Sequence, residues 1–288
     1  MHVFINGRFL PEEQATVSVF DRGYLYGDGL FETILVLNHS PFRWEQHMRR
    51  LEAGAAYLNI GLPFTRHALR EAASALIDIN HFPNALLRLT LSRGVGSRGY
   101  SPRGADKPTL VLTLHRTTAP DRHICPQWRL VTSSIRLPVA QRLAQFKTCN
   151  KLPQILARSE AEAAGAQEAL LLNTAGAVVE ATSSNLFWIA GGSVCTPPLE
   201  SGILAGITRG LVAEICESIR VPLVETTIMP DQLRLAEGVF LSLSSVGIAE
   251  AVVLDGKPLR QSALTHRIRN VFLEVLHEET GWGVADVV

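Results

Sequence analysis

The sequence "QRLAQFKTCNKLPQILARSEAEAAG" (141–165) contains two of the chain's four lysines, Lys147 and Lys151, although the 288 residues include 27 basic ones. A lysine supports chemistry that an arginine cannot, because burial can remove the proton from an amine whereas a guanidinium stays protonated. Lys151 is expected in the first turn of a helix that Asn150 caps and that tolerates Pro153 near its start. A cation there meets the positive end of the helix dipole, so Lys151 is interpreted as solvent-facing.

Lys147 precedes this helix, in the connection from a predicted strand. Site residues are often placed on such connections. Of the other two lysines, Lys107 lies in a polar loop and Lys257 beside a turn, and both are interpreted as surface residues. The position of Lys147 alone leaves open whether it is catalytic or solvated, so other segments must decide.

The bulk composition argues against several classes of protein. The formal net charge is zero, whereas nucleic-acid-binding proteins usually carry a basic surplus. No apolar run reaches the ~18–20 residues of a membrane span, and the N-terminus lacks the basic and apolar regions of a signal peptide. The four cysteines are widely spaced, which favours reduced thiols and a cytoplasmic location. The histidine spacing indicates no metal site.

Residues 1–116 predict a small α/β domain. A hairpin is expected to turn at Asn6-Gly7, and Thr65 is expected to cap a helix. The predicted elements are hairpins over 2–10 and 29–44, helices over 44–58 and 65–79, and strands over 84–94 and 107–116.

Residues 117–128 carry two prolines and polar residues, so they are predicted as the linker to a larger C-terminal domain at 129–288. That domain is expected to contain a strand over 128–137, a helix over 152–165, short antiparallel strands over 168–198, a helix over 207–219, a hairpin around Asp255-Gly256 and a helix over 262–280. Strands outnumber long βαβ units, which favours an α+β two-domain fold with antiparallel-rich sheets.

The motif "GVGSRG" (94–99) matches the G-x-G-x-x-G pattern of dinucleotide-binding proteins and follows a predicted strand. Such a site also needs a helix that begins within the motif, so that its amides meet the pyrophosphate. Here "YSPRGADKP" follows, with two prolines and no helical period. The motif is therefore interpreted as a glycine-rich loop that presents Arg98 and Tyr100.

Two segments of the C-terminal half supply groups that a lysine-dependent cofactor needs. "SGILAGITRG" (201–210) leads into a helix with Ile207 and Thr208 in its first turn, where N–H groups and a hydroxyl can bind phosphate. "SLSS" (242–245) offers further hydroxyls, although each of these residues is equally typical of a cap or a turn. Glu180 ends a predicted strand, and a carboxylate there could hold a pyridinium nitrogen protonated. Lysine, phosphate cup and carboxylate together are what pyridoxal phosphate requires.

The chain resembles the fold-type IV family of pyridoxal-phosphate enzymes, which is class IV aminotransferase-like. The segments that carry this resemblance are "FINGRF" (4–9), "DRGYLYGDGLFET" (21–33), "FKTCNKLPQILARSEA" (146–161), "GAVVEATSSNLFW" (176–188) and "TPPLESGILAGITRG" (196–210). The resemblance implies the fold of the D-amino-acid aminotransferases and a homodimer of two-domain subunits. It also implies pyridoxal 5'-phosphate as the cofactor, bound between the domains.

The resemblance further implies which residues meet the cofactor. Lys147 matches the Schiff-base lysine, and Glu180 matches the residue at the pyridine nitrogen. The residues implied at the phosphate are Arg50, Ile207, Thr208 and Ser244.

Three activities compete within the family, namely branched-chain aminotransferase, D-amino-acid aminotransferase and aminodeoxychorismate lyase. "SRGVGSRGYSP" (92–102) resembles a loop of the lyase, with Arg98 at its substrate-binding arginine. The D-amino-acid enzymes have R-x-H where this chain has Arg98-Gly99-Tyr100. Thr33 matches a threonine at the lyase's reacting centre, and 147–161 resembles a lyase segment with Cys149 in place of the usual Leu.

Other features resemble the aminotransferases. Glu32 beside Thr33, and "DRGYLYGDG" (21–29), are also similar to the D-amino-acid enzymes. Because successive strand residues point to opposite faces, only one of Glu32 and Thr33 is expected to face the cofactor. Glu32, Arg98 and Tyr100 are the candidate substrate-binding residues.

The resemblance thus predicts a lyase that converts 4-amino-4-deoxychorismate to 4-aminobenzoate and pyruvate, in folate biosynthesis. Lys147 is expected to act as general base and Thr33 to relay a proton. The alternative is an aminotransferase for D-amino acids or branched-chain amino acids, which would use the same Lys147 with a 2-oxo acid acceptor. A pyridoxal-phosphate carrier without catalysis would need this base removed, and Lys147 is present.

Overall fold

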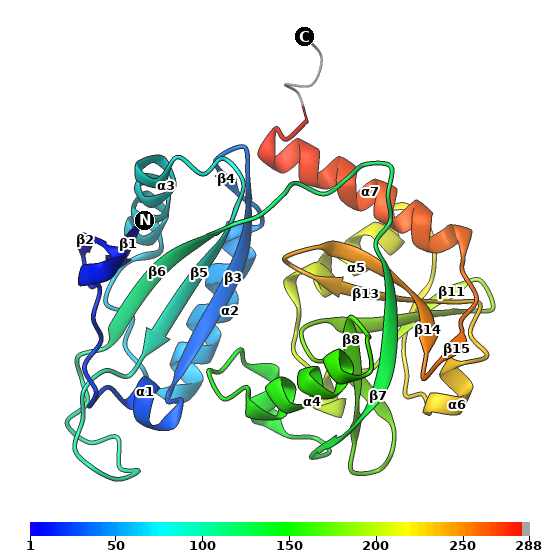
Figure 1. Ribbon diagram of the computed structural model, residues 1–288, viewed down its shortest axis with the longest axis horizontal. Coiled ribbons are helices and arrows are strands. Elements are labelled where there is room, and N and C mark those ends of the chain that lie inside the picture. Colours follow the sequence, from blue (N-terminus) through cyan, green and yellow to red (C-terminus); the bar gives the residue numbers. More distant parts are fainter. Residues whose placement is uncertain (284–288) are drawn as a thin grey trace. The chain divides into compact units, whose positions relative to one another are not determined.

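The structure is a computed structural model that describes residues 1–283 (Figure 1). The chain forms two units. The first contains Met1–Ala119, Phe146–Asn150 and the described residues from Leu276 onward, and the second contains Pro120–Gln145 and Lys151–Val275. The predicted division into domains at 117–128 stays a prediction, although the first change of unit falls within that range.

The sheet of the first unit is built from strands whose side chains alternate between its two faces. Its order is β2 (Arg8–Pro11), β1 (His2–Ile5), β6 (Thr109–Arg116), β5 (Ala85–Ser92), β3 (Gly29–Leu37) and β4 (Ser40–Pro41), and all neighbouring strands are antiparallel. In β5, Leu87, Leu89 and Leu91 are fully buried, whereas Leu86 and Arg88 are half-buried. One face of this sheet therefore carries the core.

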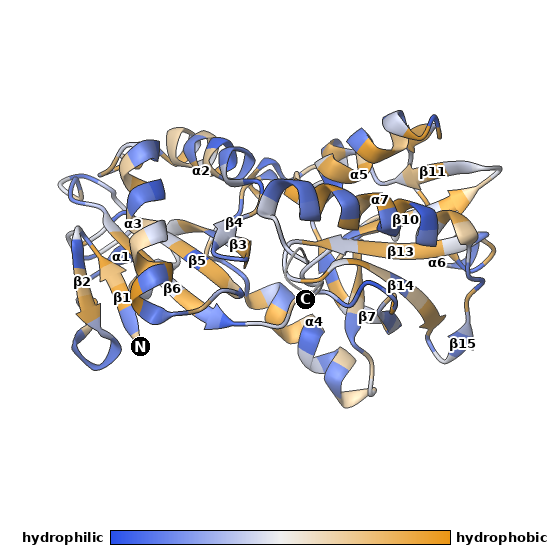
Figure 2. Cartoon of the chain, turned by 90° about the horizontal axis from the view of Figure 1, so that it is seen from above, coloured by the Kyte–Doolittle hydropathy of each residue, from blue (hydrophilic) through white to orange (hydrophobic). Residues whose placement is uncertain are grey.

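Two helices, α2 (Trp44–Leu58) and α3 (Arg66–Asn80), contribute the other half of that core. In Figure 2 helix α2 bears both hydrophilic and hydrophobic residues, as a helix buried on one side requires. The predicted start and end of α2 are confirmed, and so is the cap of α3, because the Thr65 hydroxyl accepts a hydrogen bond from the Ala68 N–H at 3.2 Å. Two short elements were not predicted, namely α1 (Arg22–Tyr26) and the 3-10 turn η1 (Glu12–Gln14).

The turn between β1 and β2 has the predicted geometry. Asn6 and Gly7 both take positive φ angles, +48° and +91°. A two-residue hairpin turn of the primed type requires positive φ at both positions, which Asn and Gly adopt at low cost. The prediction of a hairpin over 2–10 is confirmed.

The sheet of the second unit mixes antiparallel and parallel pairs. Its order is β12 (Leu223–Glu225), β11 (Ser193–Thr196), β10 (Asn185–Ala190), β13 (Gly238–Leu243), β14 (Gly247–Leu254), β7 (Gln127–Leu137), β8 (Glu168–Asn173) and β9 (Val178–Ala181), and β15 (Lys257–Pro258) pairs with β14. The antiparallel pairs expected over 168–198 are present as β8 with β9 and β10 with β11. The parallel pairs of β7 with β8 and β14, and of β11 with β12, were not predicted.

The helices of the second unit position its loops. In α4 (Leu152–Ala163), Ala157 and Ala161 are fully buried against β7 and β8. Helix α5 (Ile207–Ser218) contacts β13. The remaining elements are η2 (Arg142–Gln145), η3 (Leu199–Ser201), α6 (Pro230–Leu233) and α7 (Ala263–Thr280). Within residues 1–283, no helix combines the length and the apolar composition that crossing a membrane requires.

We predict that truncating the buried face of β5 costs far more stability than truncating its other face. Leu87→Ala should lower the free energy of unfolding by about 2–5 kcal/mol, because it leaves a cavity in a fully packed core. Leu86→Ala, one residue earlier on the half-buried face, should lower it by less than half as much. Urea unfolding followed by circular dichroism measures both values. Equal losses would contradict the assignment of the two faces.

Candidate active site

The connection that carries Lys147 pairs with the first residues of β3. The Phe31 N–H donates to the Lys147 carbonyl at 2.9 Å, and the Cys149 N–H donates to the Gly29 carbonyl at 2.9 Å. Leu30 and Thr148 form the bridge between these two bonds. The segment 147–149 is therefore held along the edge of β3 although it is remote from it in sequence.

Lys147 lies on the face of β3 that points away from the core. Its Nζ is 4.6 Å from the centre of the Phe31 ring, and the Arg88 guanidinium lies 4.0 Å from the same ring. Thr33 is two residues beyond Phe31 on the strand and so points to the same face. Glu32 points to the opposite face, beside the core residue Ile34. Of the two neighbours Glu32 and Thr33, it is Thr33 that shares a face with the lysine.

Lys151 has a different place from the one predicted. It is the N-cap residue of α4, rather than a residue of the first turn, and no side chain caps this helix. The predicted cap, Asn150, instead donates from Nδ2 to the Gly27 carbonyl at 3.0 Å. A long-range hydrogen bond thus replaces the local one that the sequence pattern predicted.

Glu32 is the centre of a buried cluster of charged groups between β3 and α2. Arg50 donates to both of its oxygens, from Nε at 2.8 Å and from Nη2 at 2.6 Å, and His47 Nδ1 lies 2.7 Å from Oε2. The exposed fractions of these side chains are 1% for Glu32, 9% for Arg50 and 2% for His47. The bidentate pair fixes the plane of the Arg50 guanidinium.

Opposing effects act on the two titratable groups of this cluster. Burial raises the pKa of the Glu32 carboxyl. The charge and hydrogen bonds of Arg50 and the hydrogen bond of His47 outweigh this effect and lower the pKa to about 2. Burial lowers the pKa of His47, and the Glu32 carboxylate offsets only part of that effect. The ionised carboxylate can only accept, so a neutral His47 carries its hydrogen on Nδ1.

The loop of "GVGSRG" (94–99) is not followed by a helix within residues 95–108, since the chain reaches β6 at Thr109 without one. Residues 95–108 therefore lack the helix N-terminus that a dinucleotide site requires. Arg98 and Tyr100 are both exposed, and Tyr100 shows 88% of its surface. Within the described residues, the Arg98 side chain has no hydrogen-bond or ion-pair partner.

In the second unit, Glu180 is tied to the loop that leads into α5. Its Oε2 accepts from the Leu204 N–H at 3.1 Å and from Asn185 Nδ2 at 3.5 Å. Asn185 Nδ2 also donates to the Leu204 carbonyl at 2.9 Å. One amide therefore joins the predicted pyridine-binding carboxylate to the predicted phosphate loop.

The first turn of α5 offers an anion-binding site. Its N-cap is Gly206, no side chain caps it, and Ile207 and Thr208 follow as the first helical residues. A Cβ at Gly206 would lie 2.0 Å from Asn185 Oδ1, so a larger residue cannot approach this closely. Free N–H groups at the positive end of a helix dipole bind phosphate.

Two serines of β13 and its following turn belong to the same region. Ser242 is paired with Asn185 across β10 and β13, and its buried hydroxyl has no partner within residues 1–283. Ser244 follows two residues later and is half-buried. The uncapped helix start and the orphaned hydroxyl offer hydrogen-bond donors that fit a phosphate, and the Glu180 carboxylate offers an acceptor that fits a protonated ring nitrogen of pyridoxal phosphate.

Two residues beside the predicted site residues were missed by the sequence reasoning, His47 in the first unit and Asn185 in the second. His47 lies three residues before Arg50 on α2, a spacing that puts both on one helix face and could have indicated it. Asn185 carries no comparable signal, because it meets Ser242 of "SLSS" only across neighbouring strands.

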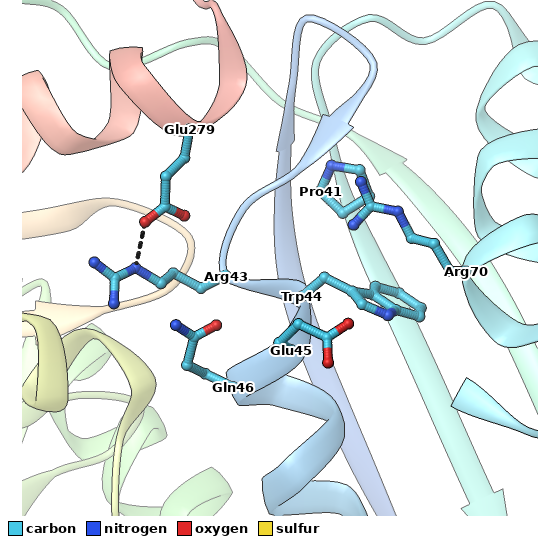
Figure 3. A pocket seen from close by; sticks show the side chains of 7 residues that line it. All are labelled: Pro41, Arg43, Trp44, Glu45, Gln46, Arg70 and Glu279. Carbon is cyan, nitrogen blue, oxygen red and sulfur yellow. Dashed lines mark ion pairs between the residues drawn. The ribbon is translucent and has the colours of Figure 1, made fainter. Parts of the chain in front are cut away.

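A separate pocket of about 280 Å³ in the first unit is lined by none of the predicted site residues (Figure 3). Arg43 pairs with Glu279 at 2.8 Å in it, and Arg70 lies over the Trp44 ring at 5.4 Å. Its charged groups are thus engaged within the protein. Across residues 1–283, no group of three or more His, Cys, Asp or Glu side chains is placed to hold a metal ion.

Comparison with known proteins gives consistent matches. The model of the family described as amino-transferase class IV matches residues 29–252. A putative branched-chain-amino-acid aminotransferase of Methanocaldococcus jannaschii is 32% identical over 291 aligned positions, which cover 99% of this chain and 98% of that protein.

Two solved structures are similar over nearly the whole chain. The branched-chain amino acid aminotransferase of T.th., in its structure with pyridoxamine 5'-phosphate, is 29% identical, with a TM-score of 0.89, covering 98% of this chain and 97% of that one. The 4-amino-4-deoxychorismate lyase of Pseudomonas aeruginosa is 32% identical, with a TM-score of 0.83, covering 94% and 98%.

We predict that Glu32 stabilises the fold in a pH-dependent way. Its pKa in the folded state, about 2, lies below the ordinary 4.5, so the stabilisation is complete above pH 4.5 and is lost as the pH falls towards 2. The difference in unfolding free energy between the parent and Glu32→Gln, on the order of 3 kcal/mol near neutral pH, should shrink over that interval.

Urea unfolding at several pH values measures this difference. Glu52→Gln is the matched control, because Glu52 pairs with Arg66 at the surface, where an ion pair contributes little. A difference for Glu32→Gln that stays constant from pH 6 to pH 2 would contradict the prediction.

Proposed function

The chain belongs to the class IV aminotransferase family of pyridoxal-phosphate enzymes, and within that family we propose that it converts 4-amino-4-deoxychorismate to 4-aminobenzoate and pyruvate. The family resemblance and the α+β fold predicted from the sequence are confirmed by the family match and the similar structures. The observation that carries the proposed reaction is the position of Thr33, on the same face of β3 as Lys147. The similarity to the lyase of Pseudomonas aeruginosa supports it.

When bound, pyridoxal phosphate supplies an electron sink for the electrons released at the amine-bearing carbon. Lys147 would hold the cofactor through Nζ. Its amine would also act as the general base that takes the proton from ring carbon 4 of the substrate. The Thr33 hydroxyl relays a proton to the departing enolpyruvate, which becomes pyruvate, and the ring that remains is aromatic.

The next group of predicted residues is proposed to bind the cofactor and to orient it. Glu180 is proposed to face the ring nitrogen, where a carboxylate favours its protonated form. The phosphate is assigned to the start of α5, with the N–H groups of Ile207 and Thr208, and to Ser244. Arg50 would add charge there, and its bidentate contact with Glu32 would set its orientation.

Arg98 is proposed to bind a substrate carboxylate, with Tyr100 beside it. A guanidinium is suited to this because it can donate two parallel hydrogen bonds to a carboxylate. We also retain the homodimer and the cytoplasmic location as proposals. All four cysteines are free thiols, in keeping with a reducing compartment.

The second candidate is an aminotransferase for branched-chain or D-amino acids. The similarity of the putative branched-chain-amino-acid aminotransferase, over 99% of this chain, favours it. Lys147 would again move the proton, but between two carbons of an amino acid, and a 2-oxo acid would be consumed. The two candidates therefore differ in whether an amino acceptor is required.

We predict that Lys147→Ala abolishes the visible absorbance of the lysine-bound cofactor, whereas Lys151→Ala retains it. The reason is that the Lys147 amine lies beside Phe31 on the face of Thr33, and Lys151 begins α4. Absorbance spectra of both purified variants, reconstituted with pyridoxal phosphate, give the result. Loss of the band in Lys151→Ala alone would overturn the assignment.

We predict that the purified enzyme forms pyruvate and 4-aminobenzoate from 4-amino-4-deoxychorismate with no 2-oxo acid added. Elimination needs no acceptor, because the amine stays on the product ring. Chromatography of both products in equal amounts is the measurement. D-Alanine or leucine with 2-oxoglutarate serves as the parallel reaction, and turnover there without any from aminodeoxychorismate would establish the second candidate instead.

A further inference from the structure

Arg22 is a buried arginine that no step of the proposed reaction uses. It lies at the start of α1 and is 3% exposed. Its Nη1 donates to the carbonyls of Gly99 at 2.8 Å and Ser101 at 3.1 Å, and its Nη2 donates to the carbonyl of Tyr100 at 3.1 Å. One guanidinium thus binds three successive carbonyls of the loop that carries Arg98.

A carboxylate holds this guanidinium in place from the other side. Arg22 Nε donates to Asp28 Oδ2 at 2.8 Å. Asp28 also accepts from Arg93 Nε at 2.8 Å and Nη2 at 3.1 Å. Because a buried charge without such partners would be costly, the pairing with Asp28 fixes where the Arg22 guanidinium can lie.

Tyr26, one helical turn after Arg22, supports the same loop. Its hydroxyl accepts from the Gly99 N–H at 3.1 Å, and its ring lies 5.0 Å from the Arg22 guanidinium carbon. The rings of Tyr26 and Tyr100 meet edge to face at 5.6 Å. The backbone of residues 99–101 is therefore held through both its donors and its acceptors.

The glycines of "GVGSRG" allow the loop to approach this anchor. A Cβ at Gly96 would lie 2.9 Å from both Arg22 Cδ and Ala105 Cβ. Gly94 takes φ +85°, and a Cβ there would lie 1.9 Å from the Lys107 carbonyl oxygen. Close packing thus accounts for Gly96 over Arg22 and for Gly94 against Lys107, and the φ of +104° accounts for Gly99, without a nucleotide.

We propose that Arg22, together with Tyr26, is a positioning residue that fixes residues 99–101 so that the exposed Arg98 guanidinium is pre-oriented for a substrate carboxylate. The role given to Arg98 rests on the proposed function, whereas the anchoring of the loop does not. An arginine on an ordered loop loses less conformational freedom when it binds than one on a free loop. The anchor therefore acts on substrate affinity through Arg98.

The first test measures the loop without substrate. Deuterium uptake is followed for peptides covering residues 95–103 of the purified holoenzyme, in Arg22→Lys, in Tyr26→Phe and in the control Tyr24→Phe. Tyr24 is also in α1 but is 75% exposed, and within the described residues it has no partner. Loss of one hydrogen bond should speed exchange about fivefold in Tyr26→Phe, and Arg22→Lys, which cannot reach three carbonyls, should exceed this.

Uptake in Tyr26→Phe and Arg22→Lys equal to that of Tyr24→Phe would overturn the anchoring. Tyr26→Phe removes only a hydroxyl, so this variant keeps the test valid if Arg22→Lys unfolds. The exchange result does not depend on which reaction the enzyme catalyses. A failure of the proposed lyase activity therefore leaves this measurement interpretable.

The second test is a double-mutant cycle with Arg98, using whichever substrate the enzyme turns over. Tyr26→Phe should raise KM about fivefold and leave kcat nearly unchanged, and the cofactor absorbance should not alter. In an Arg98→Ala background the same substitution should have no further effect on KM, because it acts through Arg98. An equal effect of Tyr26→Phe in both backgrounds would show that the anchor does not act through Arg98.

Discussion

The pairing of residues 147–149 with the start of β3 is the interaction on which the proposed site depends. It brings a lysine from far along the chain to one strand of the first unit, through two backbone hydrogen bonds. Because backbone groups make this contact, it does not use the lysine side chain. Because successive side chains of a strand point to opposite faces, the residues of β3 fall into two groups. Thr33 and Phe31 face the lysine, while Glu32 and its neighbours face the core and α2.

Two carboxylates, one on β3 and one just before it, hold three arginines of the first unit. Glu32 holds Arg50, and Asp28 holds Arg22 and Arg93. Buried ion pairs often contribute little net stability, because desolvation of both charges offsets their attraction. Besides the stability that Glu32 contributes, each carboxylate has a geometric role, since it fixes a guanidinium that would otherwise sample many rotamers. Arg50, proposed at the phosphate, and Arg22, which holds the substrate loop, are thus both oriented by a buried or half-buried carboxylate.

The sequence was sufficient to predict those elements whose form depends on residues close together in the chain. The ends of α2, the Thr65 cap and the Asn6-Gly7 turn follow from periodicity, hydrogen-bonding capacity and φ preference. The predicted cap at Asn150 was wrong, because its amide binds the Gly27 carbonyl instead. Helix α1 has five residues and is too short to show a helical period. The roles of Lys147 and Glu180 came from the family resemblance, and His47 and Asn185 act through contacts across elements, which no single segment encodes.

Two of the first unit's segments that resemble the family are packed against each other. "DRGYLYGDG" (21–29) contributes Arg22, Tyr26 and Asp28, and "SRGVGSRGY" (92–100) contributes the loop that these residues hold. The family resemblance relates the first motif to the lyases and to the D-amino-acid aminotransferases alike, and it implies that residues 98–100 differ between them. An anchor that binds backbone carbonyls is indifferent to the side chains it presents. A change of substrate could therefore arise at positions 98 and 100 while Arg22 continues to hold the same backbone.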